Sequence, residues 1–421
     1  MRKLTLTALL LALLLAAGGT YLLYEKLRVE VFFKPEYPRL GLKSRVHLEV
    51  KPSFSVPFGE VEVFVRQGNA SAVLYEGPIA PFAETLIFEP KKAGFRDGEA
   101  EVVGVVRLPF KEERIFYQKV VVDLTPPTLE VVRKPRYLKV GEPGVLTLKS
   151  SEELLRAQIR FGEAVFPLLE VEGGTYKTVV TVPLFALEEP QSFYAEAVDA
   201  AGNEVRKFVP LPVRLVKFRT VKVEFDRQTL QELLLKFFNS VEDPAAQFRI
   251  VNEEFRREDQ RTLVRLAQNS TDRLLAKGAF KQLPGSAVTA RYGDHRLYYF
   301  EGKKIGESYH GGLDLAKYRH APVVAANDGR VVFAGRLKIY GNAVVIDHGF
   351  GVLTLYGHLL DYSVKVGQTV KKGEVIGRTD TTGFALGDHL HFATLVWGYA
   401  ANPIYFFDGN YLKYHFYEPL R

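Results

Sequence analysis

The sequence predicts a mainly β protein, in which an antiparallel β-sheet domain follows two β-sandwich domains and a helical linker region. Three observations lead to this prediction. Short runs of alternating apolar and polar residues recur through the first half, separated by Gly, Pro and Asn. Helical periodicity is confined to one stretch after Phe225, and strand patterns with tight glycine turns resume after Pro284. A chain of 421 residues is also long enough for about three domains.

The N-terminus carries an export signal or an anchor. Arg2 and Lys3 precede an uncharged run from Leu4 to Tyr24, which is long enough as a helix to span a bilayer core of about 30 Å. A cleaved signal would need a clear small-x-small site, and only Ala16 to Gly19 is a loose candidate. We expect residues 1–27 to be an uncleaved transmembrane anchor, with a cleaved signal as the alternative. In both cases the rest of the chain is exported.

The overall charge is mildly basic. A formal net charge of +7 and a pI near 9.2 suit an anionic polymer or a membrane surface, but they are too weak to indicate nucleic acid, and no nucleic-acid-binding motif is present. The chain has no cysteine, which fits a protein that works in an oxidising compartment without disulfides.

Residues 28–124 predict the first β-sandwich, because short alternating runs such as Glu60 to Val65 are broken by turn residues. His47 lies in one of these runs without a motif partner, and we interpret it as structural. Thr125-Pro126-Pro127 marks the next boundary, since proline cannot continue a strand.

Residues 125–215 predict a second β-sandwich. Its Asp-Leu-Thr-Pro-Pro start and the Val198-Asp199-Ala200-Ala201-Gly202-Asn203 sequence near its end resemble bacterial immunoglobulin-like repeats. That resemblance implies a spacer or docking module without chemistry of its own.

Residues 216–281 predict a helical linker or regulatory region. Asp226 can cap a helix whose apolar positions Leu230, Leu233, Leu234 and Phe237 follow helical spacing. A second helical stretch is expected from Asp259 to Lys277, ending at Gly278. The region either joins two modules or packs on the C-terminal domain and covers its groove.

Residues 282–421 predict an antiparallel sheet, and this domain holds the histidines of interest. They occur in three pieces: His310-Gly311-Gly312-Leu313-Asp314, Tyr356-Gly357-His358 and His389-Leu390-His391. Side chains alternate along a strand, so His389 and His391 are expected on the same face. Two histidines and one aspartate suit zinc with a position left open for water, and no cysteine offers a thiolate.

From about Leu283 to Phe407 the chain resembles the zinc metallopeptidases of the lysostaphin/LytM type, peptidase family M23, which cut peptides in bacterial peptidoglycan. The resemblance rests on these motifs, in order: Tyr292-Gly293-x-x-Arg296, His310-x-x-x-Asp314, Pro322-Val323-x-Ala325-Ala326-x-x-Gly329-x-Val331, Tyr340-Gly341-Asn342, Tyr356-x-His358, Gly377 through Gly383, His389-Leu390-His391-Phe392 and Asn402-Pro403.

The resemblance implies a residue-by-residue site. His310, Asp314 and His391 would be the ligands of one Zn²⁺ per chain, and His358 and His389 the two catalytic histidines. Two departures from the family pattern are Asp388, where the family usually has Pro, and Phe392-Ala393, which replaces the commoner Phe-Glu. The histidines without motif support are interpreted as structural: His295, His320, His348 and His415.

The function implied is a zinc metalloendopeptidase that hydrolyses peptide cross-links of peptidoglycan, with the stem-peptide cross-link favoured over a glycine bridge. The alternative is a non-catalytic activator or scaffold for another cell-wall hydrolase. The expected partners are peptidoglycan, the membrane through the N-terminal segment and cell-wall proteins through the β-domains. The expected location is the cytoplasmic membrane, with the peptidase domain on its periplasmic or extracellular side.

Overall fold

The computed structural model describes residues 25–421, apart from 57, 110 and 282. With 49% of the chain in strands and 15% in helices, the mainly β prediction is confirmed. Nearly all of the expected anchor, residues 1–27, lies outside the described residues. Among the residues that are described, no helix is long and apolar enough to cross a membrane.

Two compact units make up the chain. The first extends to Pro127 and takes in two short later segments, Glu153–Leu155 and Val198–Glu204; the second holds the remainder. The division at Pro127 coincides with the proline boundary seen in the sequence.

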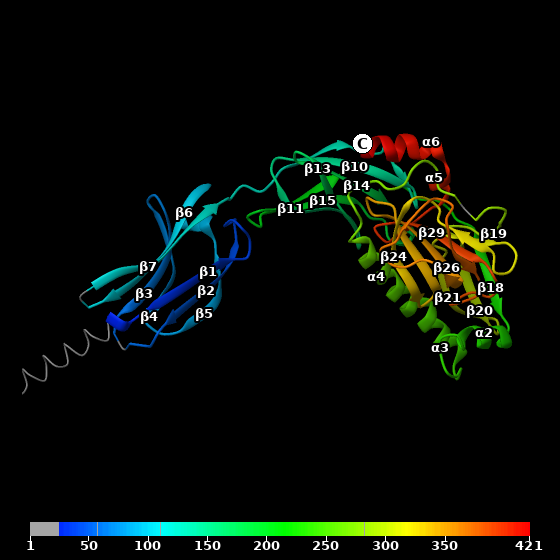
Figure 1. Ribbon diagram of the computed structural model, residues 1–421, viewed down its shortest axis with the longest axis horizontal. Helices are drawn as coiled ribbons and strands as arrows, with labels where there is room; N and C mark the ends of the chain where they lie inside the picture. The colour runs from blue at the N-terminus through cyan, green and yellow to red at the C-terminus, as the bar shows by residue number, and fades with distance from the viewer. Residues whose placement is uncertain (1–24, 57, 110, 282) are drawn as a thin grey trace, which may run out of the picture. The chain divides into compact units, whose positions relative to one another are not determined.

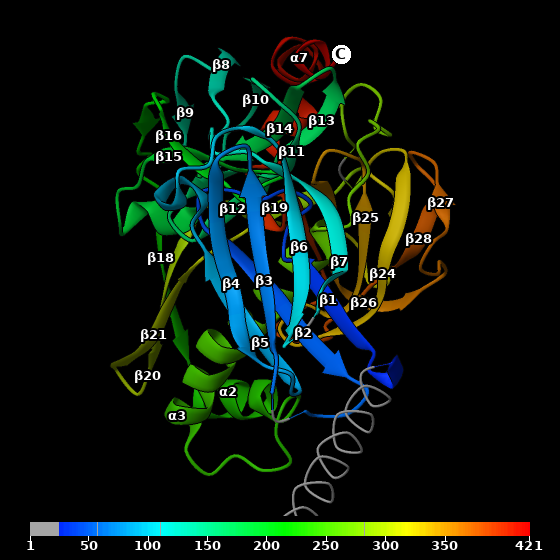
Figure 2. The ribbon, with the colours of Figure 1, turned by 90° about the vertical axis from the view of Figure 1, so that its left-hand side faces the viewer.

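The first unit contains two antiparallel sheets. One has the order β1-β2-β5 and the other β4-β3-β6-β7; Figure 2 shows β3, β4 and β6 of the second sheet side by side. Their bounds are β1 Val29–Pro35, β2 Ser44–Pro52, β3 Glu60–Gln67, β4 Ala70–Pro78, β5 Phe82–Phe88, β6 Gly98–Leu108 and β7 Lys111–Val122, with a 3₁₀ turn η1 at Pro90–Ala93.

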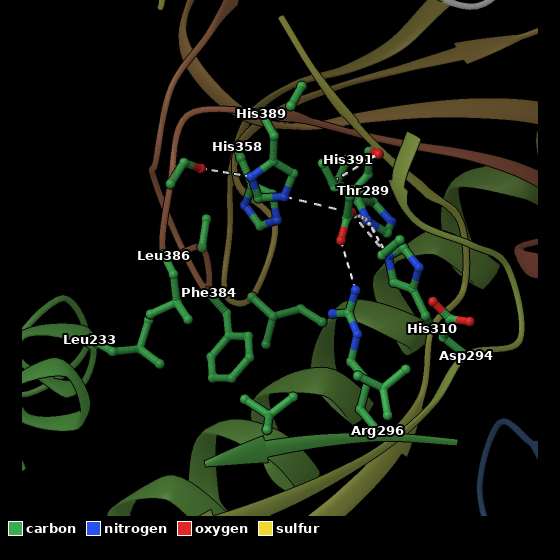
Figure 3. Close-up of a pocket in the computed structure, with 18 of the residues that line it drawn as sticks. Leu233, Thr289, Asp294, Arg296, His310, His358, Phe384, Leu386, His389 and His391 are labelled. Atoms are coloured by element: carbon green, nitrogen blue, oxygen red, sulfur yellow. Dashed lines mark hydrogen bonds and ion pairs between the residues drawn. The ribbon is translucent and has the colours of Figure 1, made fainter. Parts of the chain in front are cut away.

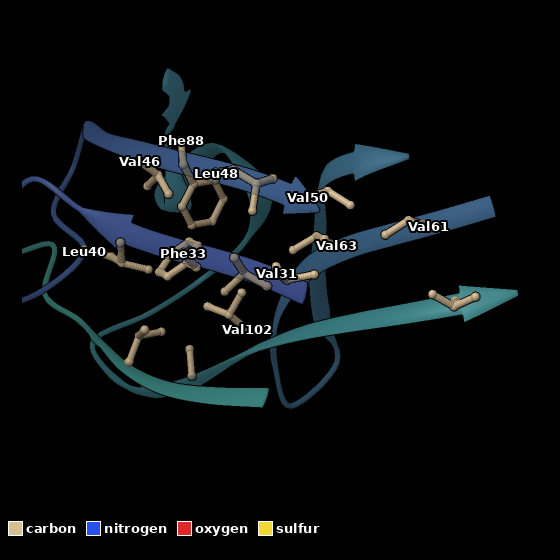
Figure 4. Close-up of a cluster of buried hydrophobic side chains, with 14 of the residues drawn as sticks. Val31, Phe33, Leu40, Val46, Leu48, Val50, Val61, Val63, Phe88 and Val102 are labelled. Atoms are coloured by element: carbon tan, nitrogen blue, oxygen red, sulfur yellow. The ribbon is translucent and has the colours of Figure 1, made fainter. Parts of the chain in front are cut away.

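Alternation along the strands produces the core of this unit. In β2, Val46, Leu48 and Val50 are fully buried, while His47 between them is exposed and has no role in a buried site. Figure 4 shows these side chains gathered with Val31 of β1 in one apolar cluster.

The second unit begins with two four-stranded sheets, ordered β13-β14-β10-β8 and β12-β11-β15-β16, while β17 pairs in parallel with β9. Their bounds are β8 Leu129–Arg133, β9 Leu138–Lys139, β10 Pro143–Ser150, β11 Leu154–Phe161, β12 Ala164–Pro167, β13 Leu169–Glu172, β14 Thr175–Thr181, η2 Leu184–Leu187, β15 Phe193–Asp199, β16 Glu204–Val209 and β17 Val213–Arg214. The likeness of this part to immunoglobulin-like repeats stays a prediction.

The next segment contains β18 Thr220–Phe225, α2 Arg227–Leu234, α3 Pro244–Arg249, the π-helical turn η3 Ile250–Phe255 and α4 Arg256–Ala267. Asp226 caps α2 as predicted, since its side chain accepts a hydrogen bond from the Thr229 N–H.

The expected helix from Asp259 to Lys277 is wrong in its C-terminal part, because α4 ends at Ala267. The backbone beyond it hydrogen-bonds instead to the turn between β25 (Gly341–Asp347) and β26 (Val352–Tyr362). The Leu275 N–H donates to the His348 carbonyl, and the Thr271 carbonyl accepts from the Phe350 N–H. These tertiary hydrogen bonds replace the helical ones.

β18 also belongs to a three-stranded sheet, β18-β20-β21, that was not predicted. It pairs in parallel with β20 (His295–Phe300), which pairs antiparallel with β21 (Lys303–Tyr309). Phe225, Leu233 and Tyr298 belong to one buried cluster with α2 and α3. The segment therefore packs on the C-terminal domain.

The largest sheet is antiparallel throughout, with the order β19-β22-β29-β26-β25-β24-β27, and β23, β28 and β30 attached to it (Figure 1). The bounds are β19 Ala287–Ala290, β22 Leu313–Ala316, β23 Pro322–Val324, β24 Gly329–Leu337, β25 Gly341–Asp347, β26 Val352–Tyr362, β27 Thr369–Val370, β28 Val375–Thr379, β29 Leu390–Val396 and β30 Tyr399–Ala401. Short helical turns end the chain: α5 Ile404–Phe407, α6 Gly409–Leu412, η4 Lys413–Tyr417 and α7 Glu418–Leu420.

Candidate active site

A cavity of about 460 Å³ lies between the three-stranded sheet β18-β20-β21 and the largest sheet. Val221 and Val223 of β18 line one side of the cavity. Their register partners in the neighbouring strand β20, Arg296 and Tyr298, line the same side. His310, Asp314, His358, His389 and His391 line the other side, as Figure 3 shows for the four histidines. The structure thus brings all five predicted site residues into one cavity.

Three of these side chains converge. Nε2 of His310 lies 3.0 Å from Oδ1 of Asp314 and 3.1 Å from Nδ1 of His391, and that Nδ1 lies 3.0 Å from the same Oδ1. All three residues are buried, with at most 8% of their surface exposed.

Strand register produces this convergence. Asp314 in β22 lies directly opposite His391 in β29, so the two side chains project from neighbouring strands on the same face. A Cβ on Gly312 would stand 2.4 Å from the Phe392 carbonyl oxygen. Glycine at this position therefore lets β22 approach β29 closely.

The converging atoms suit a cation. The His310 Nδ1–H donates to the Arg291 carbonyl at 3.0 Å, which leaves a lone pair on Nε2. Three acceptor atoms then face one another at 3.0–3.1 Å, a separation close to the roughly 3.3 Å between ligands around tetrahedral zinc. The donor set therefore fits zinc.

Asp314 is held from both sides. Its Oδ2 accepts a hydrogen bond from Nη2 of Arg296 at 2.7 Å. Burial alone would raise the pKa of Asp314, but the imidazoles of His310, His389 and His391 outweigh it and hold that pKa well below its usual range. Asp314 is therefore a carboxylate. Burial also lowers the pKa of His391 to about 4, so this imidazole is neutral at physiological pH.

His358 and His389 have the same hydrogen-bonding arrangement. Each donates its Nδ1–H to a backbone carbonyl at 2.7 Å, His358 to Thr382 and His389 to Gly387. The Nε2 atom of each ring is thus the one available for chemistry. Their ring centroids are 4.9 Å apart.

The backbone aims His358. Its φ of 61° is in the left-handed region, and the pairing of β26 with β25 shifts register between Asn342 and Val344. The His358 N–H donates to the Tyr340 carbonyl at 2.7 Å. This local irregularity directs the imidazole into the cavity, where bulges often re-aim functional side chains.

The two rings differ in electrostatic environment. Burial and the neighbouring His389 and His391 lower the pKa of His358 well below its usual value. For His389, Nε2 lies 3.5 Å from Oδ1 of Asp314, and this carboxylate outweighs burial and raises the pKa of His389.

The histidines interpreted as structural lie outside this convergence. His348 is fully buried, with Nδ1 2.7 Å from the Asp328 carbonyl oxygen and Nε2 2.8 Å from Oγ1 of Thr354. His295 pairs with Glu307, His320 lies 3.6 Å from Asp380, and His415 stacks on Tyr411.

Asp388, which stands where the family usually has Pro, lines the cavity, but its carboxylate is already hydrogen-bonded to neighbouring residues. Its carboxylate accepts hydrogen bonds from the His320 N–H at 3.0 Å and the Thr379 hydroxyl at 2.6 Å.

Sequence reasoning missed several contributors. Arg296 belongs to the Tyr292-Gly293-x-x-Arg296 motif, but no role was predicted for it from the sequence. The sequence feature that could have indicated a role is a charged residue within a strand rich in aromatic residues. Tyr340, whose ring centroid is 5.1 Å from that of His391, was likewise assigned no role. Burial raises the pKa of Tyr340 to about 12, so its hydroxyl keeps its proton. Arg219 and Arg256, from the region expected to be a linker, also line the cavity.

Comparison with known proteins places this site in a family. Residues 308–403 match the model of peptidase family M23. The chain is 45% identical over 95 residues to the DD-carboxypeptidase/endopeptidase Mpg of Neisseria meningitidis, covering 23% of this chain and 22% of that protein. It is 41% identical over 95 residues to the peptidoglycan DD-endopeptidase ShyA of Vibrio cholerae, with the same coverage.

Among solved structures, the catalytic domain of lysostaphin from Staphylococcus simulans is 30% identical, with a TM-score of 0.28, and covers 31% of this chain and 98% of that one. The match to the curated relatives spans only 22% of their length. Residues 308–403, which carry all five predicted site residues, are a peptidase family M23 domain.

Proposed function

We propose that this chain is a zinc-dependent endopeptidase that hydrolyses peptide cross-links of bacterial peptidoglycan. The observation that carries the proposal is the convergence of a two-histidine, one-aspartate cluster with two further histidines in one cavity. Three relatives are named peptidoglycan DD-endopeptidases, and these names support the substrate class.

His310, Asp314 and His391 would hold the metal. Their acceptor atoms converge, and the distances show that Nδ1 is the His391 atom directed at the cluster. Nε2 of His391 is buried with no hydrogen-bond partner in the described part of the chain. Zinc bound there supplies a Lewis acid for the scissile carbonyl and the attacking water.

His358 and His389 would move the protons. Because a backbone carbonyl holds the Nδ1–H of each ring, Nε2 is free to accept a proton or to donate one. Hydrolysis of a peptide bond needs a base for the attacking water and a donor for the developing oxyanion. The paired imidazoles provide both groups on one side of the cavity.

The bond cut, in this proposal, is the D,D cross-link between stem peptides. The relatives at 45% and 41% identity are named a DD-carboxypeptidase/endopeptidase and a peptidoglycan DD-endopeptidase, which supports a D,D bond as the target. An apolar wall that includes Val221, Val223, Leu233 and Phe384 offers contact for the aliphatic parts of such a peptide.

Mass spectrometry of digested peptidoglycan tests the proposal. The zinc-loaded chain should release muropeptides with new free termini at the cross-link, and the His358→Ala variant should release none. Zinc content is measured on the same samples. A zinc-loaded wild-type chain that releases nothing would overturn the peptidase assignment and favour the activator alternative.

The substrate also sets the location. Peptidoglycan lies outside the cytoplasmic membrane, so we place the peptidase on the periplasmic or extracellular side, with residues 1–27 as anchor and the β-sandwich domains at 28–124 and 125–215 as spacers or docking modules. In untreated cells the chain should sediment with the membrane fraction. Protease added to intact spheroplasts should degrade it. A chain protected from protease would contradict this placement.

A further inference from the structure

Three arginines line the catalytic cavity, and two of them are neutralised. Arg219 donates from Nε to Oδ1 of Asp294 at 3.1 Å and from Nη2 to Oδ2 at 2.5 Å. Arg296 pairs with Asp314. In each pair the guanidinium already donates to a carboxylate, and this negative charge reduces its attraction for an anionic ligand.

The third, Arg256, has no carboxylate within 4.0 Å in the described part of the chain. Its contacts are two long hydrogen bonds to Asn252: Nε to the carbonyl oxygen at 3.2 Å and Nη2 to Oδ1 at 3.3 Å. Asp259 lies one turn further along α4, but its two oxygens accept the Lys338 and Ile339 N–H groups at 2.8 and 2.7 Å. Arg256 is thus the arginine of this cavity wall that forms no salt bridge with a carboxylate among the described residues, although its charge acts on nearby Asp259.

The backbone of Arg256 is held in place. It is the first residue of α4 and follows η3, where Val251 is fully buried in the cluster that contains Phe248. Asn252 donates from Nδ2 to the Glu307 carbonyl at 2.9 Å. A guanidinium on such a fixed element can select a ligand by geometry, because its planar donors match a carboxylate.

We propose that Arg256 binds a free carboxylate of the peptide substrate and so selects stem peptides whose acidic groups are not amidated. The inference rests on the proposed peptidase function and adds a specificity residue to it. Arg256 lies outside residues 308–403, so this selectivity belongs to the segment that packs against the M23 domain.

The cavity chemistry agrees with an anionic group at this position. A partly buried arginine loses hydration that a carboxylate can replace, and charge-assisted hydrogen bonds are about twice as strong as neutral ones. Asp294 and Asp314 are paired with arginines, and Asp388 is bonded to His320 and Thr379, so the described acids of the cavity have partners of their own.

A matched pair of substrates tests the inference. Two cross-linked stem peptides differ only in whether their side-chain and α-carboxylates are free or amidated, and the zinc-loaded full-length chain is assayed on both. Wild type should show a KM about tenfold lower for the acidic peptide. Arg256→Gln should raise that KM about tenfold, leave kcat within about twofold and leave the amidated peptide unaffected. Arg257→Gln, at the next and exposed position of α4, is the control and should behave as wild type.

Two outcomes would overturn the inference. In the first, Arg256→Gln raises KM equally for both peptides, as a structural role predicts. In the second, it changes KM for neither peptide. Equilibrium binding of the two peptides is measured in parallel, which separates this inference from the proposed function. If wild type cleaves neither peptide, the peptidase proposal fails. A tenfold binding preference for the acidic peptide that Arg256→Gln removes still supports the role of Arg256, and equal binding of both peptides refutes it.

Discussion

Arg296 donates a hydrogen bond from Nη2 to Oδ2 of Asp314 at 2.7 Å, while Oδ1 of the same carboxylate faces His310 and His391. Burial would lower the pKa of Arg296, but Asp314 outweighs it and raises that pKa, so the guanidinium stays charged. Arg296 lies opposite Val221 in the three-stranded sheet. This one contact therefore ties that sheet to the candidate metal ligand.

Replacing Arg296 with Met should weaken zinc binding about 10- to 100-fold, the usual effect of removing an outer partner of a metal ligand. Chelator competition measures the affinity. Arg219→Met is the matched control, because Arg219 pairs with Asp294 and does not touch Asp314. Equal zinc affinities in Arg296→Met and wild type would show that the ion pair does not orient Asp314.

His310→Ala and Asp314→Ala should each lose zinc and hydrolysis together, because each removes one of the three acceptor atoms that converge among the described residues. Metal content by inductively coupled plasma mass spectrometry and peptidoglycan digestion check this. His295→Ala, in which the lost side chain pairs with Glu307, should keep both. Full zinc occupancy in Asp314→Ala would remove that residue from the ligand set.

His358→Ala should keep its zinc but lose about 10²- to 10⁴-fold in kcat, the range typical for a proton-transfer residue. The same is expected of His389→Ala, because its ring lies beside that of His358. Both variants are assayed at matched zinc content. Wild-type turnover in either variant would exclude that histidine from proton transfer.

Gly312→Ala should destabilise the peptidase sheet by about 1–3 kcal/mol, since the new Cβ would meet the Phe392 carbonyl oxygen at 2.4 Å. Gly311→Ala is the control, because its Cβ would only reach the Ala400 Cβ at 3.4 Å, an ordinary contact. Denaturant unfolding with an intrinsic fluorescence probe gives both values. A Gly312→Ala chain as stable as Gly311→Ala would mean that β22 and β29 tolerate a wider spacing.

His348 should make stability pH-dependent. Burial lowers its pKa to about 4 in the folded chain, against about 6.5 when unfolded. The unfolded state therefore binds more protons, and the stability present above pH 6.5 is lost as pH falls towards 4, by about 2 kcal/mol at pH 5. The loss between pH 7 and pH 5 should be smaller by that amount in His348→Gln. An identical pH dependence in both proteins would contradict a neutral buried His348.

Much of the fold followed from local pattern. Alternation identified the strands that became β2 and β3, tight glycine turns marked those that became β25 and β26, and the Asp226 cap placed the start of α2. The glycine turns between Val366 and Gly377 also predict a hairpin there, and this prediction is wrong, since β27 pairs with β24 and β28 pairs with β23 and β26. Periodicity reports which face of a strand is buried but carries no information about its partner strand.

The sequence by itself determined which side chains are available for chemistry and their local spacing. The His-x-x-x-Asp and His-x-His pieces are short-range patterns, and a strand places His389 and His391 on one face whatever surrounds it. Only the tertiary structure decided that Arg296 holds Asp314, that a shift in strand register aims His358, and that β18 and α4 help to line the cavity. The physical reason is that these features depend on contacts between segments far apart in the chain, whose register and packing no local pattern encodes.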